Sequence, residues 1–148
     1  MSELLNQALA EGSISVRAIA SNWKQAIELA GDALVTSQRT TTQYTVAMVK
    51  AFEDLGPYMV IAPGIALAHA KPSEAVLGTG LSLITLTEPV VFGSEANDPV
   101  RLVIGLAAVD HDSHIDLMAA LSDLLMDVMK VNMLLQAENV EQVRDLLR

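Results

Sequence analysis

The side chains of this chain best suited to chemistry near neutral pH are its three histidines, because an imidazole titrates near pH 6.5. His69 follows a short apolar segment at 65–67, inside the stretch 62–72 that holds Pro63-Gly64 and ends at Pro72. His111 and His114 lie between an apolar segment at 100–109 and a helical pattern after it. In α/β sheets, ligands gather at the carboxyl ends of strands, so we expect these two loops to meet.

A metal site is the first chemistry that such histidines allow. His111 and His114 are three residues apart, Asp110 and Asp112 adjoin them, and His69 adds a third nitrogen. The pattern has no cysteine and no H-E-x-x-H motif, and it falls at the start of a helix. It therefore remains one alternative, a metal-binding protein that uses all three histidines.

Hydrolysis and phosphoryl transfer are the other two chemistries. Acid–base hydrolysis would use histidine and aspartate with Ser113 or Ser73 as nucleophile, but no G-x-S-x-G turn is present. In the third chemistry His69 itself is the nucleophile and forms a phosphohistidine. A phosphoryl group carries roughly two negative charges, which N–H groups of a helix starting at Ser113 and a second imidazole, His114, could meet.

The composition excludes several classes of protein. The 148 residues include no cysteine, so we expect no disulfide, no thiolate metal site and no cysteine nucleophile. The net charge is -9 and no basic cluster stands out, which argues against a nucleic-acid partner. No apolar run is long enough to span a membrane, and the first residues lack a signal-peptide pattern, so we expect a cytoplasmic protein without membrane insertion.

Helical and strand patterns alternate along the chain, and no repeat or linker divides them, which favours one domain over residues 1–148. Helical spacing predicts helices at 2–10, 21–34, 40–55, 113–128, 131–136 and 139–147, with Ser2 and Ser21 as caps and a capping box at Thr40 and Gln43. Strand patterns cover 13–20, 58–62, 65–67, 77–87 and 100–109, with an edge segment at 89–93. The order predicts an α/β fold in layers.

A family resemblance rests on the motifs of these segments. Pro63-Gly64-Ile65-Ala66-Leu67-Ala68-His69, followed later by His114-Ile115 at the start of an apolar helix, resembles the IIA component of the bacterial phosphoenolpyruvate-dependent sugar phosphotransferase system, mannitol/fructose class (EIIA type 2). The segments 56–64, Asn97-Asp98-Pro99-Val100 and Ala107-Ala108-Val109-Asp110 look closest to the ascorbate-type branch.

The resemblance implies a fold, a reaction and partners. The fold is a three-layer sandwich with a mixed, mostly parallel sheet and helices on both sides. His69 accepts a phosphoryl group from the phosphocarrier HPr and passes it to a cysteine of a separate EIIB, which serves a membrane EIIC. His114 supports the phosphorylated state by hydrogen bonding. No cofactor or metal is implied. The sugar stays undetermined, with ascorbate or a related sugar or polyol favoured, and a homodimer is left open.

Two positions depart from the mannitol-type pattern. The mannitol-type pattern has an arginine in the helix before the histidine loop, and Ala51 occupies that position here. It commonly has a proline directly before the active histidine, and Ala68 occupies that position here. Lys71 is the candidate to replace the positive charge, and Ser113 is a second candidate phosphate ligand. His111 is expected beside the site. A regulatory module of the same fold, which controls a partner through its phosphorylation state, is the main alternative to transport.

Overall fold

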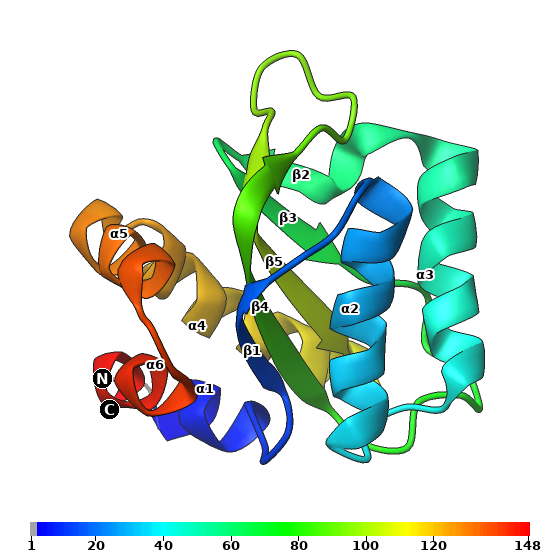
Figure 1. Cartoon of the computed structure of the whole chain (residues 1–148). Helices are drawn as coiled ribbons and strands as arrows, with labels where there is room; N and C mark the ends of the chain where they lie inside the picture. The colour runs from blue at the N-terminus through cyan, green and yellow to red at the C-terminus, as the bar shows by residue number, and fades with distance from the viewer. Residues whose placement is uncertain (1–2) are drawn as a thin grey trace.

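A computed structural model describes residues 3–148, so the predicted cap Ser2 lies outside the described residues. The chain forms a five-stranded sheet between two layers of helices (Figure 1). The strands are β1 (Ile14–Ala18), β2 (Val60–Ala62), β3 (Ile65–Ala68), β4 (Gly80–Val90) and β5 (Val100–Ala107). The helices are α1 (Glu3–Ala8), α2 (Trp23–Thr36), α3 (Thr42–Leu55), α4 (His111–Leu125), α5 (Val128–Gln136) and α6 (Val140–Leu147), with a 3-10 turn, η1 (Pro57–Met59).

The strand order is β1-β4-β5-β3-β2, and the sheet is mixed. β1 runs parallel to β4 and β3 parallel to β5, whereas the β4–β5 and β2–β3 pairs are antiparallel. Helices α2 and α3 cover one face, and α1, α4, α5 and α6 cover the other (Figure 1). The predicted α/β sandwich with helices on both sides is confirmed.

The core is split by the sheet into two clusters, and β3 shows why. Neighbouring residues of a strand point to opposite faces. Ala66 and Ala68 therefore pack in the cluster beneath α2 and α3, while Ile65 and Leu67 pack with the other helices. All four residues are buried, as expected for a strand covered on both faces.

Gly64 fixes the start of β3, the end of the strand that lies away from His69. Its N–H donates to the Asn97 carbonyl at 2.8 Å, and its own carbonyl accepts from the N–H groups of Arg101 and Leu102 at 2.8 and 3.0 Å. The φ angle of +76° suits glycine, which has no Cβ. The Pro63-Gly64 turn therefore anchors the start of β3 to the start of β5, and His69 lies at the other end.

Two predicted helix caps are wrong. The cap of α2 is Asn22, whose Oδ1 accepts from the Gln25 N–H at 2.9 Å, while the Ser21 N–H donates to the Gln25 side chain. The cap of α3 is Thr41, without a side-chain hydrogen bond. Thr40 precedes this cap and forms an isolated β-bridge with Val76, and its buried hydroxyl has no hydrogen-bond partner within residues 3–148, so no capping box forms.

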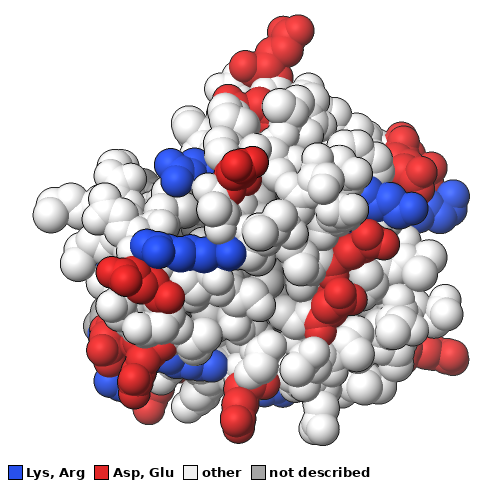
Figure 2. All heavy atoms as spheres, viewed as in Figure 1, with Lys and Arg blue, Asp and Glu red and all other residues white. Residues whose placement is uncertain are grey.

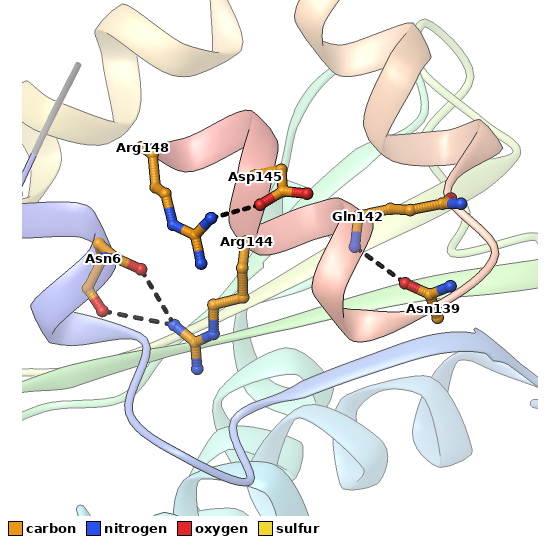
Figure 3. Close-up of polar contacts among 6 residues, drawn as sticks. All are labelled: Asn6, Asn139, Gln142, Arg144, Asp145 and Arg148. Carbon is orange, nitrogen blue, oxygen red and sulfur yellow. Dashed lines mark hydrogen bonds and ion pairs between the residues drawn. The ribbon is translucent and has the colours of Figure 1, made fainter.

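Arg144 joins the last helix to the first. Its guanidinium donates to the Asn6 carbonyl and side-chain oxygens at 3.4 and 3.3 Å (Figure 3), and to the Ala10 carbonyl at 3.1 Å. Carbonyls in the last turn of a helix lack intrahelical donors, so the guanidinium satisfies the Asn6 carbonyl of α1, whereas the Ala10 carbonyl beyond the helix also accepts from the Ser13 N–H. Burial, the largest cause, and the nearby Arg148 lower the pKa of Arg144.

Charged side chains are dispersed over the face of the molecule seen in Figure 2. On the face shown in Figure 2, lysine and arginine side chains are separated from one another by white and red atoms. No helix within residues 3–148 is long and apolar enough to cross a bilayer.

Candidate functional site

His69 is the first residue after β3 and lies partly exposed at the carboxyl end of the strand. Its Nδ1 lies 3.0 Å from the carbonyl oxygen of Leu67. A carbonyl can only accept, so Nδ1 carries the proton of the neutral ring. Nε2 then holds the free lone pair, and the ring is a nucleophile at that atom.

Tyr58 packs against the same imidazole. The two ring centroids are 5.7 Å apart and the planes meet at 77°, an edge-to-face contact. Tyr58 belongs to η1, which replaces the start of the strand predicted at 58–62, and its side chain is about half exposed. The phenol ring therefore restricts one side of the His69 imidazole, while the Leu67 carbonyl holds its tautomer.

His114 lies in the first turn of α4. This helix begins at His111, two residues earlier than predicted, because the Asp110 side chain accepts from the Ser113 N–H at 2.8 Å and caps it. Hydrogen bonds from the Ser113 backbone and hydroxyl hold the pKa of Asp110 below its usual value. The cap fixes the orientation of the turn that carries His114.

The sheet brings the two histidine segments together. β3 and β5 are parallel neighbours, paired through Ala68 and Gly105, so both chains leave the sheet at the same edge. His114 and His69 interact electrostatically: burial, then the positive charges of His69 and His111, lower the pKa of His114. The lowered pKa therefore favours the neutral His114 ring, in which one nitrogen donates and the other accepts.

The remaining candidates differ in how they are held. Lys71, two residues beyond His69, is exposed, and no ion pair within residues 3–148 ties down its ammonium group. Ser113 is at the third position of α4, and its N–H is already taken by Asp110. Ala51, where the family arginine would fall, packs against the core from α3 and carries no charge.

The alternative of a three-histidine metal site finds no support in the described part of the chain. There, no three histidine, aspartate or glutamate side chains are grouped closely enough to hold an ion. Ser73 is a candidate nucleophile for the hydrolase alternative. Its Oγ accepts from the Ala75 N–H in an exposed turn, which is a local turn contact.

Two tyrosines at the site were not predicted from the sequence. Tyr58 falls in the strand predicted at 58–62, and Tyr44 falls in the helix predicted at 40–55. The Tyr44 hydroxyl contacts backbone groups beside His69, and the Tyr58 ring contacts His69 itself. The available signal was chemical, since a buried phenol needs a hydrogen-bond partner and the chain has only two tyrosines.

Comparison with known proteins defines the class. Residues 7–148 match the family described as "Phosphoenolpyruvate-dependent sugar phosphotransferase system, EIIA 2". The chain therefore belongs to the EIIA type 2 family and is a phosphotransfer component of such a system. The resemblance inferred from the His69 and His114 motifs is confirmed at the level of the family.

Within this family, the relatives include ascorbate-specific proteins. The chain is 43% identical over 111 residues to the ascorbate-specific PTS system EIIA component of Salmonella choleraesuis, covering 74% of this chain and 72% of that one. The mannitol-specific cryptic enzyme IIA of Escherichia coli superposes with a TM-score of 0.86 at 37% identity, covering 97% of both chains. The IIA of an E. coli mannitol IIA–phosphorylated IIB complex gives a TM-score of 0.82 at 31% identity, covering 94% and 96%.

Proposed function

We propose that this protein is a phosphocarrier that takes a phosphoryl group from phosphorylated HPr onto Nε2 of His69 and passes it to a cysteine of a cognate EIIB. The observation that carries the proposal is the bond from His69 Nδ1–H to the Leu67 carbonyl, because it leaves Nε2 as the nucleophilic atom. Two in-line displacements complete the reaction.

In the first displacement, the Nε2 lone pair forms a bond to phosphorus, and the bond between phosphorus and HPr breaks with its electron pair remaining on HPr. In the second, a cysteine thiolate of EIIB attacks phosphorus, and the electron pair of the P–N bond returns to Nε2. His69 ends as the neutral imidazole with which it began. No oxidant or reductant is needed, because phosphorus does not change oxidation state.

The other site residues stabilise the phosphorylated state. A neutral His114 donates one N–H to a phosphoryl oxygen, and its pKa, which burial lowers most, favours the neutral ring that this role uses. Lys71 supplies the positive charge that the family arginine gives elsewhere. Ser113 contributes its hydroxyl by turning it from the Asp110 carboxylate to a phosphoryl oxygen, while its N–H stays bonded to Asp110.

The surface beside the site suits protein partners. Tyr58, Val109 and Ile115 adjoin the site residues and are between 47% and 51% exposed, so apolar side chains border the histidines. The IIA–phosphorylated IIB complex of a structural neighbour supports an EIIB partner. The ascorbate-specific relatives favour ascorbate or a related compound as the substrate of the transport system, through EIIB and a membrane EIIC.

The test is phosphorylation from labelled phosphoenolpyruvate with enzyme I and HPr. We expect one acid-labile, base-stable phosphate per chain, absent in His69→Ala and retained in His111→Ala. Wild type that stays unlabelled, or His69→Ala that is labelled as wild type, would overturn the proposal. Ascorbate-type and mannitol-type EIIB proteins are then offered as acceptors. Transfer to the first alone supports the ascorbate assignment, whereas transfer to neither favours the regulatory alternative.

A further inference from the structure

Tyr44 places a single oxygen atom among the backbone groups of both histidine segments. It lies in α3 with only 1% of its surface exposed. Its phenol oxygen is 2.7 Å from the Leu106 carbonyl and 3.1 Å from the Ala70 carbonyl, and it accepts from the Ala70 N–H at 3.0 Å. Burial, the largest cause, raises the pKa of Tyr44, so the hydroxyl keeps its proton and can donate to a carbonyl.

The partners of this hydroxyl lie next to the two histidines. Ala70 directly follows His69. Leu106 is in β5, four residues before Asp110, the cap of the helix that carries His114. The last paired residues of β3 and β5 are Ala68 and Gly105. Beyond that pair the strands separate, and the phenol oxygen takes the place of the next ladder hydrogen bonds.

We propose that Tyr44 is a positioning residue for phosphoryl transfer: its hydroxyl sets the separation between His69 and His114 where β3 and β5 diverge. This inference rests on the proposed phosphocarrier function. In-line transfer depends on geometry, and a displacement of about 1 Å can cost roughly 100-fold in rate. The hydroxyl contacts backbone atoms only, so it acts through the two histidines and does not touch the phosphoryl group itself.

The test is Tyr44→Phe, which keeps the buried ring and removes the oxygen. We expect the single-turnover rate of transfer from phosphorylated HPr to fall about 10- to 100-fold, with the half-saturating concentration of HPr unchanged. The imidazole 15N spectrum should change as well, because a displaced Ala70 loosens the His69–Leu67 bond and allows both tautomers. A rate within twofold of wild type, with the wild-type 15N spectrum, would overturn the proposal.

Ser82→Ala is the matched control. Ser82 is fully buried in β4, and its hydroxyl donates to the Ala30 carbonyl at 2.8 Å, so this variant also loses one buried side-chain-to-backbone hydrogen bond. We expect its transfer rate to stay within twofold of wild type even if its melting temperature falls. An equal loss of rate in both variants would show general loosening and contradict a positioning role.

One measurement needs no variant, in case Tyr44→Phe does not fold. Hydrogen exchange of the wild-type Ala70 amide should be slow, because the phenol oxygen holds it beyond the end of the ladder. Exchange at the rate of an exposed loop would contradict the inference. This outcome is independent of the phosphocarrier proposal, which fails only if wild-type His69 is not phosphorylated.

Discussion

The imidazole of His69 meets the phenol ring of Tyr58 edge to face, with ring centroids 5.7 Å apart. Such a pair is worth about 0.5–1.5 kcal/mol. Tyr58→Ala should therefore slow phosphorylation of His69 by roughly 2- to 10-fold in rapid-quench experiments. Tyr58→Phe keeps the ring and should match wild type, whereas equal loss in both variants would mean that the hydroxyl, and not the ring contact, is what matters.

The lowered pKa of His114 has a consequence for stability. The unfolded chain, with an ordinary histidine pKa near 6.5, binds a proton more readily than the folded chain does. Stability should therefore fall as the pH drops from about 6.5 toward the lower folded pKa. His114→Gln should lose part of this dependence, measured as the change in urea midpoint between pH 7.5 and 5.5. If the difference between the midpoints at pH 7.5 and 5.5 were the same in His114→Gln as in wild type, the lowered pKa of His114 would not be the source of this pH dependence.

Lys71 should matter through its charge. A cation a few ångströms from a phosphoryl group in a solvent-exposed site stabilises it by about 1 kcal/mol. Lys71→Ala should therefore slow phosphoryl transfer about fivefold, whereas Lys71→Arg keeps the charge and should not slow it. The difference should shrink at high salt, because exposed charges are screened. Lys50→Ala, on α3 and paired with Asp54 at 3.5 Å, is the control. No effect of Lys71→Ala at low salt would remove Lys71 from the site.

Gly31 lets α2 and α3 approach closely. A Cβ at this position would lie 2.5 Å from Cγ2 and 2.8 Å from Cβ of Thr45. Gly31→Ala should therefore lower the free energy of unfolding by about 1–3 kcal/mol, measured by urea denaturation. Thr45 Oγ1 is buried and finds no hydrogen-bond partner within residues 3–148, so adding Thr45→Ala should restore most of the loss. A double variant no more stable than Gly31→Ala alone would contradict this account.

Arg144 lies in α6 and Arg148 is the C-cap of that helix, and the two arginines should differ in their effect on stability. Arg144→Ala removes the bonds to Asn6 and Ala10 and should cost about 1 kcal/mol of unfolding free energy. Arg148 pairs with Asp145 at the surface, so Arg148→Ala should change stability by less than about 0.5 kcal/mol. Thermal and chemical denaturation would measure both. Equal effects of the two variants would contradict the prediction that the link between α6 and α1 contributes more than the surface ion pair.

Local sequence was a good guide wherever periodicity dominates. The strand predicted at 100–109 and the helix predicted at 139–147 appear as β5 and α6. Predictions failed where a distant segment competes for the backbone. The strand expected from Leu77 begins instead at Gly80, because the N–H groups of Leu77 and Gly78 donate to the Arg39 carbonyl.

At the candidate site, the sequence singles out candidate residues but not the contacts that join them. His69 and His114 follow from their motifs, and the expectation that their loops meet agrees with the parallel pairing of β3 and β5. Nothing local links Tyr44 to Leu106, which are 62 positions apart, or shows that the phenol reaches Ala70. Such bonds depend on the packing of α3 against the sheet, a long-range result that no short pattern carries.

Gly64 and His69 flank the four-residue strand β3 at opposite ends. Mutations at these two positions of the motif should therefore impair function in different ways. A screen for uptake would detect substitutions at either position. Replacing Gly64 should act through protein abundance. A side chain at this positive φ strains the turn, which lowers the fraction of folded protein that escapes proteolysis. Replacing His69 should leave abundance intact and abolish turnover. Immunoblots collected alongside uptake would therefore sort the mutants of this motif into two classes without purifying any of them.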